Sequence, residues 1–379
     1  MVYNLAFPYF PEEDIEEILV KFRHILSGQG MLTMGENVRN FEKQFAQATG
    51  AKYAIVTNSC TSALEISLRA IGVGQGDEVI VPVQTFIATG SCVAIINQAR
   101  VVFCEVDNNF LLDFEDLKSK ISERTKAVII VHFAGLIHPD IMQIREYLHS
   151  KNIILIEDAA HAHGAKIGEI SSGNIGDFGC FSFYSTKIMT TGEGGMLTTN
   201  DDKLALLTNS IRNRGLDVEA GQEIFLNIGS NRRMSELQAI LGLYQLKRLE
   251  EFVATRNKAA QIFRDVLKPL EQEGILGFQY YPDTIRHAYW RFVIFLKTSG
   301  FDRENLRTIL LEKGIKIDFP YDPLLHLQPV FRNLYGIKDG FLPRSEALAR
   351  THFCLPMHAL IKENDAQYIA EELIKAIKQ

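Results

Sequence analysis

One short segment of the chain combines the residue types of a covalent active site. In FSFYSTKIMTTGEGGML, residues 181–197, Lys187 stands between aromatic residues and a cluster of glycines. A lysine is usually a solvated point charge, so an ordinary strand that runs into a loop is one interpretation. The other is an amine held in an active site, where it serves as a nucleophile or a proton carrier.

Asp158 is a second candidate, because it ends the apolar run IILIED (153–158). Ligands of parallel sheets bind beyond the carboxyl ends of the strands, which is where this carboxylate is expected. The alternative is that Asp158 only caps the helix that follows. His161 and His163 come next in AAHAHG. Without a third ligand they indicate hydrogen-bonded side chains rather than a metal site, so we expect no metal.

A possible phosphate site precedes both candidates. The run TNSCTSALEISL leads from a predicted strand into a predicted helix, and Ser59, Thr61 and Ser62 lie at the turn. The unpaired N–H groups and the dipole of a helix N-terminus both favour an anion. Simple N-capping by serine or threonine is the alternative interpretation.

These features become informative in combination. A phosphate-binding turn, an aromatic side chain at Phe86, a strand-end aspartate and then Lys187 occur in this order along the chain. Phe86 alone would be assigned to the core. Together the residues are the parts of a pyridoxal 5′-phosphate (PLP) site, in which the lysine forms a Schiff base with the cofactor. The aspartate keeps the ring nitrogen protonated, so that the ring acts as an electron sink.

The elements that must position these residues form an α/β pattern. Amphipathic helical stretches such as 62–72 and 140–152 alternate with apolar runs that indicate strands buried on both faces. The predicted strands are residues 53–56, 78–82, 101–106, 127–132, 153–158, 178–183 and 195–199. This alternation predicts a mainly parallel seven-stranded sheet flanked by helices.

The sequence changes in character after about residue 235. A long helical pattern over 235–270 is followed by shorter elements. Those predicted elements are strands at 278–282, 289–296 and 315–320 and a terminal helix at 366–378. We therefore predict a large PLP-binding α/β domain over 1–250 and a smaller C-terminal α+β domain over 251–379.

Composition narrows the class of protein. The chain of 379 residues has a formal net charge of −6, which argues against nucleic acid as a partner. Its five cysteines are odd in number and have no CxxC spacing, so neither a disulfide framework nor a thiolate metal site is expected. We find no signal peptide and no membrane-spanning run, and we expect a cytoplasmic protein without membrane contacts.

Nearly the whole chain resembles a known family. The segments that carry the resemblance include IEDAAHAHGA (156–165), GDFGCFSFYSTKIMTTGEGGMLTTND (176–201), NRRMSELQAILG (231–242), LLHLQPVF (324–331) and LPMH (355–358). They are similar to those of the DegT/DnrJ/EryC1/StrS family of PLP-dependent sugar aminotransferases. The resemblance implies the PLP-dependent transferase type I fold, as in aspartate aminotransferase.

The resemblance also implies roles for single residues. Lys187 is expected to bind the cofactor covalently and to act as general acid and base. Asp158 is expected to pair with the pyridine nitrogen, His161 to contact the ring oxygen, and Phe86 to stack on the ring. The expected residues of the phosphate site are Ser59, Cys60, Thr61, Ser62 and Ser182.

Further expectations concern the second subunit and the substrate. Asn231 matches an asparagine that reaches the phosphate of the neighbouring subunit in relatives, which implies a homodimer with shared sites. Candidates for lining the substrate pocket are Arg233, Tyr321, His326 and His358. The chain departs from the family pattern at Cys60, where relatives usually have glycine, and a positive φ there would strain a cysteine. The segment SGQGMLTMG, where relatives build the site entrance, is also longer than usual.

The expected activity is transfer of an amino group from L-glutamate to a keto group of a nucleotide-linked sugar. The product would enter surface glycans, such as lipopolysaccharide, or glycosylated metabolites. A nucleotide-sugar dehydratase of the same family is an alternative, but it carries a histidine in place of Lys187. Another type I enzyme, such as a desulfurase or an amino-acid aminotransferase, is disfavoured by HLQPVF and LPMH. A non-catalytic protein that binds PLP or a nucleotide sugar is disfavoured by the presence of both Lys187 and Asp158.

Overall fold

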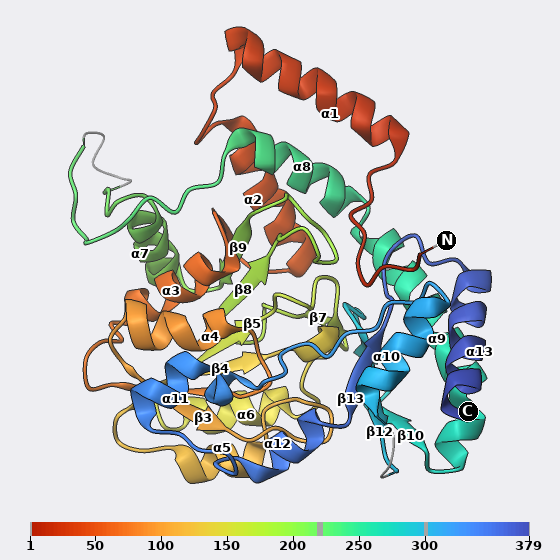
Figure 1. The fold of residues 1–379 in the computed structure, drawn as a ribbon. Coiled ribbons are helices and arrows are strands. Elements are labelled where there is room, and N and C mark those ends of the chain that lie inside the picture. The colour runs from red at the N-terminus through yellow and green to blue at the C-terminus, as the bar shows by residue number, and fades with distance from the viewer. Residues whose placement is uncertain (1, 218–222, 299–301, 379) are drawn as a thin grey trace.

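The computed structural model describes residues 2–217, 223–298 and 302–378, and its centre is a seven-stranded sheet (Figure 1). The strands lie in the order β1-β9-β8-β5-β4-β2-β3. Their bounds are β1 Tyr53–Thr57, β2 Glu78–Pro82, β3 Arg100–Cys104, β4 Thr125–Val131, β5 Ile154–Asp158, β8 Phe178–Ser182 and β9 Gly195–Thr199. All seven agree with the predicted strands to within two residues.

The sheet is parallel except at one strand. β9 runs antiparallel to both of its neighbours, β8 and β1, whereas every other pair in the sheet is parallel. Every residue of β2, β8 and β9 is buried, as expected for strands covered on both faces. The predicted α/β class with a mainly parallel sheet is therefore confirmed.

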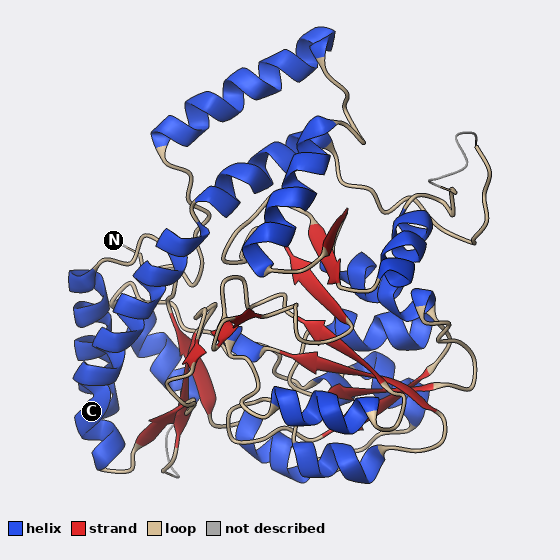
Figure 2. Cartoon of the chain, turned by 180° about the vertical axis from the view of Figure 1, so that it is seen from behind, coloured by secondary structure: helices blue, strands red, loops and turns tan. Residues whose placement is uncertain are grey.

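Helices surround this sheet (Figure 2). Helix α3 packs on β8 and β9, α2 and α7 pack on β1, and α6 packs on β5. The bounds of the helices of this part of the chain are α2 Glu36–Thr49, α3 Cys60–Ala70, α4 Ile87–Ser91, α5 Phe114–Lys120, α6 Ile141–His149, α7 Asp202–Arg212, α11 Pro329–Tyr335 and α12 Pro343–Ala349. Shorter turns are η2 Cys92–Ile96, η3 Phe133–Gly135 and η4 Leu325–Leu327.

A second, antiparallel sheet has the strand order β10-β12-β13 and lies beside helices α9 (Leu249–Gln272), α10 and α13 (Figure 1). The bounds are β10 Leu276–Phe278, β12 Phe292–Leu296, β13 His352–Leu355, α10 Arg303–Glu312 and α13 Glu363–Lys378. A third small sheet joins β11 Ile285–Arg286, β6 Lys166–Ile167 and β7 Ile170–Ser171.

The C-terminal predictions need three corrections. The strand predicted at 315–320 is wrong, because this segment makes only isolated bridges, from Ile315 to Tyr3 and from Asp318 to Cys354. The strand predicted at 278–282 is also wrong in position, because β10 covers Leu276–Phe278 and overlaps the prediction only at Phe278. Strand β13 was not predicted, and its partner β12 lies far away in the sequence.

The long helical pattern after residue 235 is two helices rather than one. Helix α8 (Glu236–Lys247) begins with a capping box, in which Ser235 and Gln238 satisfy each other's backbone N–H groups. Arg248 separates it from α9 (Leu249–Gln272) and donates from Nε to Asp14 at 2.8 Å. Asp14 belongs to α1 (Glu12–His24), which projects from the body of the molecule (Figure 1) and continues into the turn η1 (Ile25–Gln29).

Two large groups of buried apolar side chains form the interior. One lies around the seven-stranded sheet, and the other lies between α9, α13 and the β10-β12-β13 sheet. Leu324, Phe331 and Ala349 come late in the sequence but pack in the first group. The division of the chain at residue 250 therefore stays a prediction. Within the described residues, no helix is long and apolar enough to cross a membrane.

Candidate active site

A cavity of about 550 Å³ lies at the carboxyl ends of the parallel strands. Its wall is built by the start of α3, by the segments that follow β2, β5 and β8, and by residues 318–321. The structure brings Lys187, Asp158, Phe86, His161 and Tyr321 together at this cavity, although they are spread along the sequence. Ser59, Cys60, Thr61 and Ser182 also line it.

Lys187 lies five residues beyond the end of β8, in a turn closed by its N–H donating to the carbonyl of Tyr184 at 2.9 Å. Its Nζ lies 4.6 Å from the centre of the Trp290 ring. The pKa of Lys187 is lowered to about 8, mainly because of burial; the charge of Asp158 opposes this shift, and Arg291 contributes to it. The side chain is thus an amine with a substantial neutral fraction near neutral pH, as a nucleophile or proton carrier requires.

Asp158 ends β5, and its carboxylate faces the same cavity. Oδ2 accepts a hydrogen bond from the Thr89 hydroxyl at 2.9 Å, and Oδ1 accepts one from the N–H of Ala160 at 3.2 Å. Burial raises the pKa of Asp158, while the Thr89 hydrogen bond and Lys187 oppose the rise. A buried carboxylate of this kind is stabilised when a cationic N–H group binds beside it.

The N-terminus of α3 forms one end of the cavity. The side chain of Ser59 caps this helix by accepting from the N–H of Ser62, and Cys60 and Thr61 line the cavity. Gly195 lies directly against this turn, since a Cβ there would be 2.4 Å from the carbonyl carbon of Ser59. The glycine therefore permits the close approach of β9 to the helix N-terminus that shapes the cradle.

Two expectations about this turn are corrected by the structure. Ser62 is buried and does not line the cavity, because its hydroxyl donates to Asn58 Oδ1 at 2.6 Å. Cys60 is the first residue of α3 and does not belong to the residues with positive φ in the described part of the chain. The cysteine therefore carries no backbone strain there, and its side chain reaches Asp158 Oδ1 at 4.0 Å.

Three aromatic rings stack along one wall. The ring of His161 lies 3.7 Å from that of Trp290 with an interplanar angle of 10°, and Tyr321 is nearly parallel to both. The Tyr321 hydroxyl is 2.8 Å from His161 Nε2. Burial and the charge of Lys187 hold the pKa of His161 well below its usual range, so the imidazole is neutral. Its Nδ1 is buried without a hydrogen-bond partner among the described residues.

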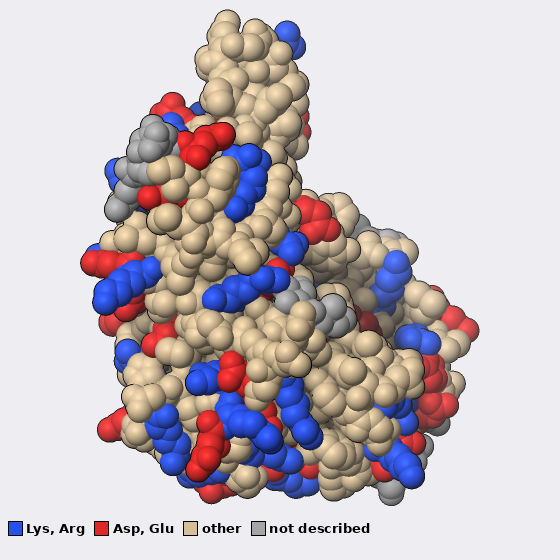
Figure 3. All heavy atoms as spheres, turned by 90° about the vertical axis from the view of Figure 1, so that its left-hand side faces the viewer, with Lys and Arg blue, Asp and Glu red and all other residues tan. Residues whose placement is uncertain are grey.

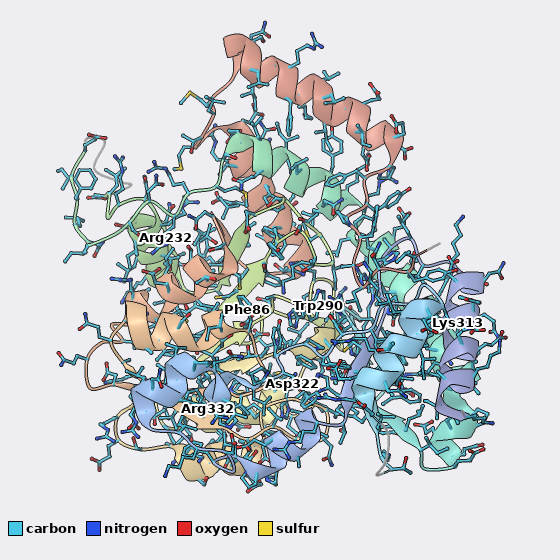
Figure 4. All side chains as sticks on the ribbon, viewed as in Figure 1. Phe86, Arg232, Trp290, Lys313, Asp322 and Arg332 are labelled. Atoms are coloured by element: carbon cyan, nitrogen blue, oxygen red, sulfur yellow. The ribbon has the colours of Figure 1, made fainter. Side chains whose placement is uncertain are left out.

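Phe86 is not a core residue, because 56% of its surface is exposed. Its ring lies 6.1 Å from that of Tyr321, and Figure 4 shows Phe86 and Trp290 both near the middle of the molecule. The exposed ring therefore borders the cavity and is available to a flat ligand.

Several residues of this site were not predicted from the sequence. Trp290 donates from Nε1 to the carbonyl of Thr186 at 2.9 Å, which fixes its ring beside Lys187. It is the single tryptophan of the chain, and this could have marked position 290 as a candidate site residue. Thr89 and Asp318 also line the cavity, but no local pattern distinguishes them from other threonines and aspartates.

Four predicted residues lie outside this cavity. Arg233 donates to Asn213 Oδ1 at 2.6 Å, and neither it nor the exposed Asn231 lines the cavity. His326 is buried 3.1 Å from Glu346 Oε1, and His358 is buried beside Phe7. The placement of His326 and His358 in the substrate pocket is thus corrected, because their rings pack in the interior.

The donor set fits PLP. The cavity offers an amine at Lys187, a carboxylate at Asp158 for a protonated ring nitrogen, and the N-terminus of α3 for a phosphate. The body of a flat ring could be contacted by two further groups, the unpartnered Nδ1 of His161 and the exposed ring of Phe86. No group of three or more His, Cys, Asp or Glu side chains within the described ranges is arranged to hold a metal ion.

Comparisons with known proteins agree with this fit. The DegT/DnrJ/EryC1/StrS aminotransferase family matches residues 12–374. GDP-perosamine synthase of Caulobacter vibrioides is 35% identical over 90% of this chain and 90% of its own length. A dTDP-3-amino-3,4,6-trideoxy-alpha-D-glucose transaminase of Micromonospora megalomicea is 30% identical over 92% of this chain and 91% of its own.

Solved structures give the same result. The aminotransferase from Psychrobacter cryohalolentis superposes with a TM-score of 0.90 at 30% identity, covering 97% of both chains. The type I fold expected from the sequence is therefore confirmed.

Proposed function

Because the chain belongs to the DegT/DnrJ/EryC1/StrS aminotransferase family, whose enzymes use PLP, we propose that it aminates a keto sugar carried on a nucleoside diphosphate. L-glutamate is the proposed amino donor. The observation that carries the proposal is the convergence of Lys187, Asp158 and the N-terminus of α3 on one cavity. Relatives named for GDP- and dTDP-linked amino sugars support the substrate class. The proposed product serves surface glycans, such as lipopolysaccharide, or glycosylated metabolites.

Each residue has a defined part in this reaction. Bound PLP supplies an electron sink, which makes the proton on the amino-bearing carbon acidic. Asp158 would hold the protonated ring nitrogen, and α3 would hold the phosphate. Lys187, with a pKa of about 8, takes that proton and returns it, as general base and then general acid.

The aromatic wall completes the site around this amine. Trp290 lies against Lys187 Nζ, and the stacked His161 ring backs it. Exclusion of water by these rings maintains the low pKa on which the proton transfer depends, since desolvation is its main cause. Trp290 is thus a positioning residue for Lys187.

The first test is the near-visible absorbance of the purified protein before and after L-glutamate. We expect a cofactor band that glutamate shifts, and GDP- or dTDP-linked keto sugars should reverse that shift. Lys187→Ala should abolish the change, whereas Lys203→Ala, at an exposed lysine of α7, should preserve it. A band that glutamate leaves untouched would refute the transaminase reaction, and failure of all keto sugars would refute the substrate class.

We also propose a homodimer with shared sites. The face of the projecting part of the molecule seen in Figure 3 shows few charged side chains. Large apolar side chains exposed there and near residue 225 are Leu19, Val20, Leu26, Met31, Leu32, Ile224, Phe225, Leu226 and Ile228. Exposed apolar surface of this extent favours a protein partner, and a second copy is the proposed one.

Subunit complementation tests the shared site. Asn231 is exposed in one protomer and is proposed to serve the phosphate of the other. Lys187→Ala and Asn231→Ala are each expected to be inactive, but a 1:1 mixture that exchanges subunits should regain about a quarter of wild-type activity. No recovery in verified mixed dimers would refute the sharing. Cytoplasmic location stays a prediction.

A further inference from the structure

Asp318 brings a carboxylate to the cavity that the cofactor chemistry does not use. It lies with Pro320 and Tyr321 on the wall that faces the strand ends. Backbone pairing with Cys354 holds the residue in place, because the N–H of Cys354 donates to the carbonyl of Asp318 at 2.9 Å. The position of the carboxylate is therefore set by the fold rather than by a free loop.

This carboxylate has unused acceptor capacity. Oδ2 receives one long contact, 3.4 Å from Arg291 Nε, and Oδ1 has no partner among the described residues. A carboxylate offers about four acceptor positions, so most of them are unpaired among the described residues, although Oδ1 is buried. Burial raises the pKa of Asp318, whereas Arg291 opposes this rise. The adjacent guanidinium thus favours the ionised, acceptor-only form.

The chemical groups of the proposed substrates limit which of them can donate a hydrogen bond to Asp318. L-glutamate carries two carboxylates, and the nucleotide carries phosphates, all of which a carboxylate repels. The donor's amino group must lie at Lys187. The hydroxyl groups of the keto sugar are the neutral donors nearest to the carbon that must lie at Lys187, whereas the donors of the nucleoside lie beyond the two phosphates, and each sugar hydroxyl can donate to a carboxylate.

We propose that Asp318, backed by Arg291, accepts a hydrogen bond from a ring hydroxyl of the keto sugar and selects sugars that keep this hydroxyl. The inference rests on the proposed function and deepens it, since it names a specificity residue for the acceptor half-reaction. Asp318 takes no part in binding L-glutamate.

The test measures the two half-reactions separately in Asp318→Asn, which keeps the size of the side chain and removes its charge. The sugar used is the GDP- or dTDP-linked keto sugar that the wild-type protein turns over. We expect kcat/KM for this sugar to fall roughly 10- to 100-fold, mainly through KM, as for loss of a hydrogen bond to a charged acceptor. The rate with L-glutamate should stay within about threefold, because no proposed contact to the donor changes.

Asp322→Asn is a matched control on the same segment (Figure 4). Asp322 also pairs with an arginine, at 2.6 Å from Arg303, and its side chain is 31% exposed against 29% for Asp318. It does not line the cavity, so both half-reactions should remain near wild type. Binding of the sugar nucleotide can be followed independently by the fluorescence of Trp290, the single tryptophan.

The outcomes separate the two hypotheses. Unchanged kcat/KM for the sugar in Asp318→Asn, or equal loss of both half-reactions in a folded variant, overturns the role of Asp318. If Asp318→Asn does not fold, Asp318→Glu keeps the charge but displaces the carboxylate, and it should lose sugar turnover alone. Failure of the wild-type protein with every keto sugar, while L-glutamate still reacts, refutes the proposed substrate and with it this inference.

Discussion

The low pKa of Lys187 predicts how fast the apoprotein reacts with its cofactor as the pH changes. Only the neutral amine is a nucleophile. With a pKa of about 8, about 9% of Lys187 is neutral at pH 7 and about 91% at pH 9. An ordinary lysine is about 0.03% neutral at pH 7 and about 3% at pH 9.

The covalent reaction should therefore accelerate about tenfold between pH 7 and pH 9, against about a hundredfold for an ordinary lysine. The assay mixes apoprotein with PLP and follows the growth of the visible absorbance band. Acetylated lysine amide, measured in the same buffers, corrects for ionisation of PLP itself. A hundredfold acceleration in the protein would refute the conclusion that burial lowers the pKa of Lys187.

The sign of the electrostatic contributions can be tested in the same assay. Asp158 raises the pKa of Lys187 against the larger effect of burial. Removal of that negative charge in Asp158→Asn should lower the pKa further, so the rate should depend even less on pH. A steeper dependence in this variant would contradict the assigned sign, whatever the change in absolute rate.

Three further variants test the supports of the site. Thr89→Val removes the hydroxyl that donates to Asp158 Oδ2, and we expect PLP to bind roughly 10- to 100-fold more weakly in an absorbance titration. Trp290→Phe loses the Nε1–H bond but keeps a ring, which should cost about 1 kcal/mol in urea unfolding, against about 3–5 kcal/mol for Trp290→Ala. Gly195→Ala places a Cβ 2.4 Å from the carbonyl carbon before α3, so both the melting temperature and PLP affinity should fall. Gly74→Ala, at an open position without a positive φ, is its control and should change neither.

The parallel sheet was predictable because burial on both faces leaves a local signature. The run at 154–158 is apolar except for its last two residues, and it forms β5 where predicted. The run at 315–320 has a similar apolar content, and Ile315 and Ile317 are buried. It forms no strand, because its neighbours on either side offer single bridges rather than a ladder. The local pattern of apolar residues indicates which residues are buried, whereas the pairing of strands depends on partners that are distant in the sequence.

The residues of the site, like the strands, were predictable where a local pattern marks them. Lys187 and Asp158 follow strands and were found through their position in an α/β pattern. The aromatic wall joins His161 to Trp290 and Tyr321, which lie more than a hundred positions further along the chain, so no spacing rule reveals it. His326 shows the opposite error, since its motif suggested a ligand contact, whereas its ring lies buried beside Glu346.

The charges that line the cavity explain why a second subunit belongs in the proposed function. Among the described lining residues, carboxylates are contributed by Asp158, Glu193 and Asp318, and the only cation is Lys187. Both proposed substrates are anionic, and the cofactor phosphate adds further negative charge. Arg291 lies behind the wall, where its charge is directed to Asp318 and to the Trp290 ring. Cations for the nucleotide phosphates therefore have to come from outside this cavity, and this need is one that the proposed partner subunit would meet.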